Sequence, residues 1–270
     1  MQRAALLCEQ FKAELQLLHV VDDDQPTSVV EQEIQQATEL VKAKASELRG
    51  TAGEEHVTIV KAGDPFQAIV QVATEANVDL VAMGAHRRRI LRDVFVGTTI
   101  ERVIRTGPHP VLMVNAEPKG PYRRVVVAVD MSEASANALG SAKSLGLFDS
   151  AQVSLVHAFE PFAKGLLIYA NIEREKIEAH VAQETTQTRR QLLDFVTNLQ
   201  LGELNYDLCL EDGPTFRAIR DFVDKKQPEL LVIGTRGLTG VQRILLGSVA
   251  DALLRGLECD ILAVPPRQEE

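Results

Sequence analysis

The chain repeats itself, and this repeat constrains its fold more than any other feature of the sequence. With an offset of 150 residues, Lys61–Ile69 falls on Glu211–Ile219, and Asp79–Gly84 falls on Glu229–Gly234. The match runs without a gap from residue 61 to residue 114. Self-similarity at one fixed offset indicates copies of one structural unit. We therefore expect two domains of the same fold in tandem.

Short apolar runs alternate with helical patterns inside each copy. Phe216, Ile219 and Val223 have the spacing of one helix face. Apolar strands separated by helices are typical of a parallel sheet covered on both faces. The sequence thus predicts an α/β fold with two doubly wound parallel sheets of strand order 3-2-1-4-5. The strands predicted for the second copy are Arg124–Val129, Val153–Phe159, Asn205–Leu210, Leu230–Ile233 and Asp260–Val264.

The first copy lacks a counterpart of the first strand. It opens on a predicted helix, Arg3–Phe11, and continues with Glu14–Val21, which matches the second strand of the other copy. Nothing in it corresponds to Arg124–Asp130, which is the middle strand in the predicted order. Its loss would leave the two inner strands either apart or newly paired. We expect either an N-terminally truncated chain or a first sheet of four strands with a repaired centre. A parallel strand within residues 1–12 would contradict this expectation.

Composition fits two soluble domains. The chain has 270 residues, of which 45% are apolar and 25% are charged, as in ordinary globular proteins. The Pro-Lys-Gly-Pro stretch at 118–121 is the predicted linker. The predicted domains are therefore residues 1–117, which form the first copy of the repeat, and residues 122–268, which form the second.

Several classes of protein are disfavoured by charge and by the pattern of residues. A net charge of −9 argues against nucleic acid as a partner. No apolar run approaches the roughly 20 residues of a membrane span, and the first residues are too soon acidic for a secretion signal. The three cysteines show no CxxC spacing. We therefore expect a reduced, cytoplasmic protein.

A glycine-rich stretch after a predicted strand indicates phosphate binding. Residues 234–248 have the spacing G-x2-G-x9-G-S and follow the apolar run Leu230–Ile233. The early glycines, Gly234 and Gly237, let the backbone approach a ligand closely. The final Gly247-Ser248 places free N–H groups at a helix start, where a phosphate is favoured. This pattern predicts a nucleotide site in the second copy.

The sequence resembles a tandem universal stress protein of the E type. The resemblance is carried by the repeated unit, the strand ending at Asp130, the His157-Ala158 pair and the glycine motif. The resemblance covers nearly the whole chain, except for the first strand of the first copy. It implies adenine nucleotide alpha hydrolase-like domains that bind ATP, with Mg²⁺ left open, at the carboxyl ends of the strands. It also implies a stress-response module that regulates or signals with little turnover.

The resemblance assigns roles to individual residues. Asp130 and Ala158 are implied to contact adenine and ribose. The residues implied to hold the triphosphate are Gly234, Arg236, Gly237, Gly247, Ser248, Val249 and Ala250.

Each of these signals also has a purely structural interpretation. The early glycines could form a tight strand-to-helix connection without a ligand. Ser248 could cap its helix, with Asp251 completing a capping-box-like pair, and Asp130 could help to cap the helix after Ser132. His19 and His157, at the ends of equivalent strands, are interpreted as buried histidines that bond to backbone.

The first copy departs from the motif where it matters for binding. Arg87 stands at the position of the second glycine, while Gly97 and Thr98 are kept. We therefore expect no ATP in this copy. The basic run around Arg87 is interpreted as a solvated helix face, and Asp22–Asp24 as a solvated turn rather than a Mg²⁺ site.

Three functional classes stay open: an ATP-binding regulator, a slow ATPase, and a scaffold for a protein or lipid partner. The first is favoured because the sequence has no Walker A, kinase or triad motif, so no catalytic residue and no metal ligand is assigned. The resemblance also implies association through the last strands. Val111–Val114 and Ile261–Val264 are therefore predicted to pair within the chain, and a homodimer of chains is left open.

Overall fold

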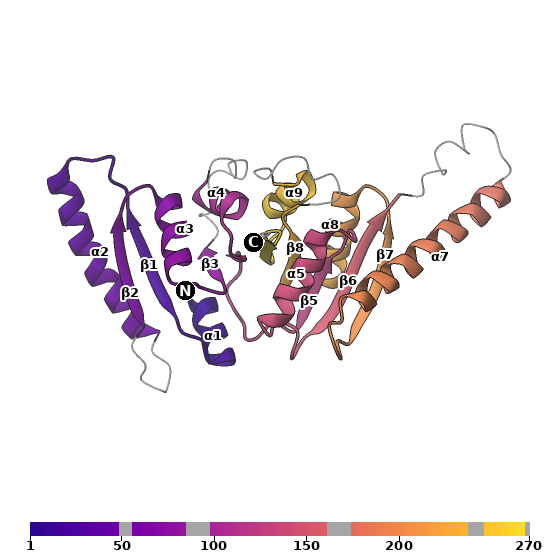
Figure 1. Cartoon of the computed structure of the whole chain (residues 1–270), viewed down its shortest axis with the longest axis horizontal. Coiled ribbons are helices and arrows are strands. Elements are labelled where there is room, and N and C mark those ends of the chain that lie inside the picture. Colours follow the sequence, from indigo (N-terminus) through magenta and orange to yellow (C-terminus); the bar gives the residue numbers. More distant parts are fainter. Residues whose placement is uncertain (49–55, 85–97, 161–173, 237–245, 268–270) are drawn as a thin grey trace. The chain divides into compact units, whose positions relative to one another are not determined.

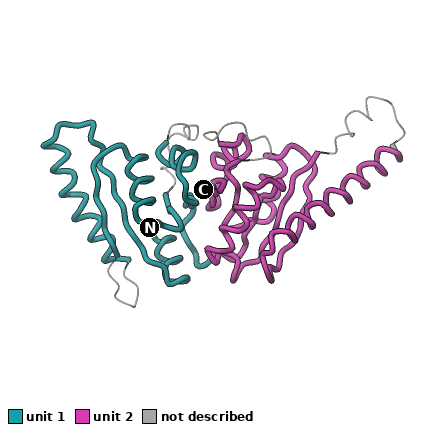
Figure 2. The backbone as a smooth tube through the Cα atoms, in the orientation of Figure 1, with its two compact units in different colours: residues 1–121 teal, residues 122–270 magenta. Residues whose placement is uncertain are grey.

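The computed structural model of the chain divides into two compact units. Unit 1 comprises Met1–Pro121 and unit 2 comprises Tyr122–Glu270 (Figure 2). Both combine parallel strands with helices (Figure 1), which confirms the predicted α/β class. The structure describes all residues except 49–55, 85–97, 161–173, 237–245 and 268–270.

The described part of unit 2 contains one parallel sheet built around β5. This strand pairs with β6 on one side and with β8 on the other, and the sheet order β7-β6-β5-β8-β9 is the predicted one. The elements of unit 2 are β5 (Arg124–Ala128), α5 (Glu133–Ser144), β6 (Gln152–Phe159), α7 (Arg174–Asn198), β7 (Tyr206–Asp212), α8 (Thr215–Lys226), β8 (Leu230–Gly234), α9 (Ser248–Gly256) and β9 (Asp260–Val264).

β5 is central because its side chains suit full burial. Val125, Val126 and Val127 are each at most 2% exposed, and β-branched residues favour the extended backbone. Helix α5 packs against β8 and β9, and α8 packs against β6 and β7. The apolar run predicted from the sequence is therefore enclosed by strands at both edges and by the core of the unit.

Polar contacts fix the amino end of this sheet. The guanidinium Nη2 of Arg124 lies 2.7 Å from the Glu229 Oε1, and the Arg124 N–H donates to the Glu229 Oε2 at 2.6 Å. The Tyr122 hydroxyl donates to the Asp260 carboxylate at 2.7 Å in a buried setting. These bonds tie the start of β5 to the starts of β8 and β9.

Unit 1 holds two separate pairs of parallel strands. β1 pairs with β2, β3 pairs with β4, and no described residue forms a strand between β1 and β3. Residues 2–11 form a helix, which agrees with the prediction that no first strand arises there. The elements are α1 (Gln2–Phe11), β1 (Gln16–Val21), α2 (Thr27–Glu47), β2 (Val57–Ala62), α3 (Pro65–Glu75), β3 (Val81–Gly84), α4 (Thr99–Thr106) and β4 (Val111–Val114).

The missing strand leaves its neighbours poorly buried. Residues 230–233 of β8 are all buried, whereas β3, its counterpart in the repeat, has no buried residue. In β1 only Leu17 and Val21 are buried. The expected four-stranded sheet with a repaired centre is therefore wrong, because β1 and β3 do not pair with one another. The predicted pairing of β4 with β9 concerns the placement of the two units relative to one another, and it stays a prediction.

Asp64 links two helices of unit 1. Its Oδ1 accepts the Gln67 N–H at 3.0 Å and caps α3, and its Oδ2 accepts from the Arg102 guanidinium at 2.9 Å. Both bonds favour the ionised carboxylate, so they lower the pKa of Asp64, the Gln67 N–H being the larger cause. Ionised Asp64 therefore stabilises the folded chain at pH values above the ordinary carboxyl pKa. This contribution is lost as pH falls through the lowered pKa of Asp64.

Replacing the guanidinium separates these two causes. In Arg102→Gln we expect the pKa of Asp64 to rise only part of the way to its ordinary value, because the N–H bond at the helix start remains. Titration of the side-chain carboxyl ¹³C signal by NMR measures this. A full return to the ordinary pKa would show that the guanidinium is the main cause.

Candidate functional site

The candidate site of unit 2 lies at the carboxyl edge of its sheet. β6, β5 and β8 are adjacent and parallel, so Ala158, Asp130 and Gly234 are brought to one edge. Both Ala158 and Asp130 are half-buried. In open α/β sheets ligands bind outside the carboxyl ends of the strands, where the strand order reverses. β5 is the strand at which this order reverses.

Asp130 is held by the turn that follows β5. Its Oδ1 accepts from the Ser132 N–H at 3.0 Å and from the Ser132 hydroxyl, and Met131 between them has φ 59°. The Ser132 Oγ in turn accepts the Ser135 N–H at 3.2 Å and caps α5. The cap is therefore Ser132, and Asp130 orients it. The Oδ2 of Asp130 makes no hydrogen bond within the described residues.

His157 joins the ends of β5 and β6. Its Nδ1 lies 2.6 Å from the carbonyl oxygen of Val129, and because a carbonyl can only accept, Nδ1 carries the proton. This agrees with the interpretation of His157 as a structural histidine bonded to backbone, although the side chain is half-buried. The same interpretation is wrong for His19, which is exposed, because unit 1 has no strand to offer the carbonyl.

Gly234 is required by the packing of a helix. A Cβ at this position would lie 2.9 Å from the backbone carbon and oxygen of Ala134, in the first turn of α5. At Gly84, the counterpart in unit 1, a Cβ would meet nothing within 4 Å. The sequence suggested that Gly234 lets the backbone approach a ligand. In the structure, the space beside Gly234 is filled by the start of α5.

Backbone bonds hold the two ends of the glycine loop together. Thr235 is buried, its N–H donates to Val264, and its carbonyl accepts the Gly247 N–H at 2.9 Å. Helix α9 therefore begins beside the end of β8. Arg236 is half-buried next to this junction, and Gly237 lies outside the described residues.

Within the described residues, no side chain caps the start of α9. The N-cap is Gly247, so Ser248 is the first helical residue and is exposed. Asp251 binds the Arg255 guanidinium through two bonds of 2.9 Å. The alternative that Ser248 and Asp251 form a capping pair is therefore wrong. The first amides of this helix, up to the buried Ala250, have no side-chain acceptor among the residues that the structure describes, and such amides favour an anion.

The equivalent helix of unit 1 supplies its own acceptor. Thr98 caps α4, and its Oγ accepts the Glu101 N–H at 3.3 Å. The Glu101 carboxylate is buried and pairs with Arg105 at 3.0 Å. Arg87, which replaces the second glycine, lies outside the described residues. The helix start that remains open in unit 2 is thus occupied in unit 1 by a threonine hydroxyl.

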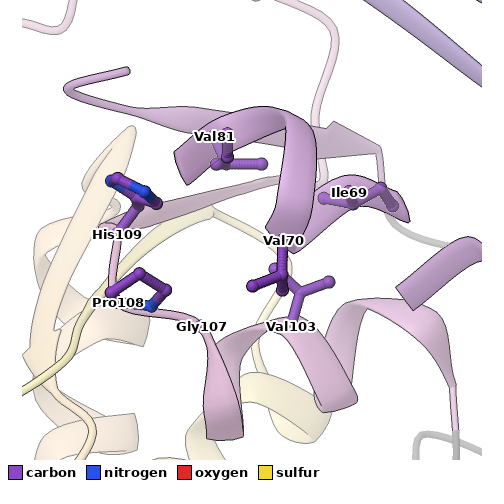
Figure 3. Close-up of a pocket in the computed structure, with 8 residues that line it drawn as sticks. Ile69, Val70, Val81, Val103, Gly107, Pro108 and His109 are labelled. Atoms are coloured by element: carbon purple, nitrogen blue, oxygen red, sulfur yellow. The ribbon is translucent and has the colours of Figure 1, made fainter. Parts of the chain in front are cut away.

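Unit 1 also contains an apolar recess and an exposed acidic turn. The recess lies between α3, α4 and the start of β3, has no room for a water molecule, and is lined mainly by apolar residues, among them Ile69, Val70 and Val103 (Figure 3). Its apolar lining does not suit a polyphosphate. The Asp22–Asp24 turn is exposed, as interpreted from the sequence, with its carboxylates within 4.8 Å of one another.

The model of the universal stress protein family matches residues 1–115 and again residues 121–265. The chain belongs to this family. Universal stress protein E of Escherichia coli is 25% identical over 271 residues, which cover 98% of this chain and 85% of that protein. Universal stress protein Sll1388 of Synechocystis is 28% identical over 150 residues, which cover 53% of this chain and 97% of that protein.

Solved structures agree with the tandem fold. A universal stress protein of Archaeoglobus fulgidus superposes with a TM-score of 0.68 at 18% identity, covering 100% of this chain and 93% of that one. A functionally unknown protein of Pseudomonas aeruginosa gives 0.63 at 19% identity, covering 98% and 86%. Family membership supports a stress-response role. Among the described residues, no helix is both long and apolar enough to cross a bilayer.

The two equivalent glycines provide a matched test of the packing. Gly234→Ala forces a Cβ against the backbone of α5, so we expect it to lower the free energy of unfolding by about 1–3 kcal/mol. Gly84→Ala should not destabilise the chain, because its Cβ meets open space. Urea denaturation of both variants measures the difference, and equal losses would contradict the assigned contact.

The two helix starts provide a second matched pair. Thr98→Ala removes the cap of α4 and should cost about 1 kcal/mol. Ser248→Ala removes no cap and should change stability by less than about 0.5 kcal/mol. Both changes are measured by thermal or urea unfolding of the whole chain. A larger loss for Ser248→Ala than for Thr98→Ala would contradict the assignment of the caps.

Proposed function

We propose that unit 2 binds ATP or a related adenine nucleotide and acts as a regulatory stress-response module with little turnover. The observation that carries this proposal is the start of α9. Its amides lack a side-chain acceptor, and the bond from Gly247 to Thr235 holds them beside the carboxyl edge of the sheet. An anionic group satisfies such amides and interacts favourably with the helix dipole.

The polyphosphate would lie against the glycine loop and the helix start. The N–H groups of Ser248, Val249 and Ala250 are its proposed donors, and Arg236 is its proposed cation. The proposed loop also includes Gly234, Gly237 and Gly247. Gly234 leaves space for the start of α5, and the Gly247 N–H donates to the Thr235 carbonyl. Mg²⁺ bound with the nucleotide is compatible with this arrangement.

The nucleoside would lie against the ends of β5 and β6. Asp130 is held through Oδ1, so Oδ2 is the oxygen proposed to accept a ribose hydroxyl. Ala158 has a short side chain beside it in the next strand and leaves room for the adenine ring. Because Ser132 fixes the carboxylate before a ligand arrives, little side-chain freedom is lost on binding.

The proposed residues favour binding over phosphoryl transfer. Transfer needs carboxylates for metal ions and a positioned base, whereas Asp130 is the one carboxylate among the proposed nucleotide contacts. One of its oxygens already serves the turn after β5. In unit 1 the equivalent helix start is capped by Thr98, so we propose a single nucleotide site per chain.

Calorimetric titration with ATP, ADP and AMP tests the proposal. We expect one site per chain, weaker binding as phosphates are removed, and loss of binding in Gly237→Asp, which places a carboxylate in the phosphate loop. Thr98→Ala is the control and should bind like the wild type. ATP binding unchanged by Gly237→Asp would overturn the proposed site.

The aspartate is tested separately. Asp130→Asn keeps the size of the side chain but weakens a charge-assisted hydrogen bond, so we expect affinity for ATP to fall about tenfold. Affinity for 2′,3′-dideoxy-ATP, which has no ribose hydroxyl, should hardly change. Equal losses for both nucleotides would contradict the ribose contact. Phosphate release above background that is abolished by Gly237→Asp would instead favour a slow ATPase.

A further inference from the structure

The strands β5 and β6 of unit 2 separate at the carboxyl edge of their sheet. Their paired register ends at Ala128 and Val156. One further bond follows, from the Val129 N–H to the Val156 carbonyl at 2.9 Å. Beyond it β6 continues beside β7 as far as Phe159, whereas the chain after β5 enters the turn in which Met131 has φ 59°. β6 therefore extends past the last main-chain bond that it makes on its β5 side.

Ala158 holds the main-chain groups that this separation leaves open. In a strand, the N–H and C=O of successive residues point alternately to the two neighbouring strands. Val156 points to β5, because its carbonyl accepts the Val129 N–H, and Phe159 points to the other side, because its carbonyl accepts the Gly213 N–H at 3.1 Å. Ala158 therefore points to the β5 side. Within the described residues no main-chain bond joins it to Val129.

The Val129 carbonyl takes its hydrogen bond from a side chain instead. In a continued parallel ladder this carbonyl would accept the Ala158 N–H. It accepts from Nδ1 of His157 at 2.6 Å. Val129 is only 3% exposed, and a buried carbonyl needs a donor. The imidazole thus supplies the bond that the ladder would otherwise make, and the half-buried Ala158 is released from it.

We propose that His157 is a positioning residue of the candidate site, which keeps the N–H and carbonyl of Ala158 open to the adenine base. This inference rests on the nucleotide site proposed above. Adenine carries a ring nitrogen that accepts a hydrogen bond and an amino group that donates one. A main-chain N–H next to a carbonyl complements both. His157 acts on the base through this open main chain, because its own Nδ1 is committed to Val129.

Two variants of similar shape separate the hydrogen bond from packing. Asparagine places an N–H donor near the position of the histidine Nδ1, whereas leucine has no donor. In His157→Leu the Val129 carbonyl loses its side-chain donor, and the Ala158 N–H is the next donor in the ladder. We expect amide exchange at Ala158, followed by NMR on the ligand-free chain, to slow about tenfold in His157→Leu. In His157→Asn it should stay as fast as in the wild type.

Two exchange results would overturn the inference. The first is an Ala158 amide that is as protected as the Val156 amide in the wild type, since the strand pair would then already be closed. The second is unchanged exchange at Ala158 in His157→Leu.

Calorimetric titration tests the link to the base. His157→Leu should bind ATP about tenfold more weakly than the wild type, because the base loses main-chain partners. It should bind inorganic tripolyphosphate, which has no base, as the wild type does. His157→Asn should recover the affinity for ATP. His180→Leu, which removes an exposed histidine of α7, is the control and should bind ATP like the wild type.

The outcomes distinguish this inference from the proposed function. Equal losses of ATP and tripolyphosphate in His157→Leu, or no recovery in His157→Asn, would overturn the role of His157. A wild-type chain that does not bind ATP would overturn the proposed function itself. In that case the exchange at Ala158 would still decide whether His157 opens the strand pair.

Discussion

The pairing of one strand at both of its edges is the constraint on which each domain depends. In unit 2, β5 joins the pair β6–β7 to the pair β8–β9. A parallel sheet buries apolar side chains on both faces only when its middle is filled. Unit 1 shows the consequence of its absence, because β1 and β3 keep their outer partners but lose burial.

The candidate nucleotide site depends on the same strand. β5 ends at the turn that orients Asp130, and its neighbour Val129 supplies the carbonyl that binds His157. The helix that follows β5 fits against β8 because Gly234 has no side chain. Only the helix start that we propose as the phosphate site is built independently, through the bond between Gly247 and Thr235. The two halves of the site thus meet where β5 and β8 are adjacent.

The two copies have diverged at their helix starts. Thr98 satisfies an amide of α4 with its own hydroxyl, whereas α9 begins at a glycine that cannot do so. A side-chain cap stabilises a helix in the absence of a ligand, whereas an uncapped helix start favours the binding of an external anion. One fold therefore presents a self-contained helix in one copy and a candidate ligand site in the other. Membership of the universal stress protein family covers both copies.

The sequence by itself determined the repeat and the α/β class, because periodicity and internal alignment are properties of the order of residues. The strand order predicted from it also placed Asp130 and the start of the glycine motif at the carboxyl edge of one sheet. Only the tertiary structure decided that Gly234 admits α5, that His157 finds a carbonyl while His19 does not, and that Gly247 rather than Ser248 is the N-cap. Each of these depends on which backbone atoms lie opposite a residue, and residues distant in the chain supply those atoms.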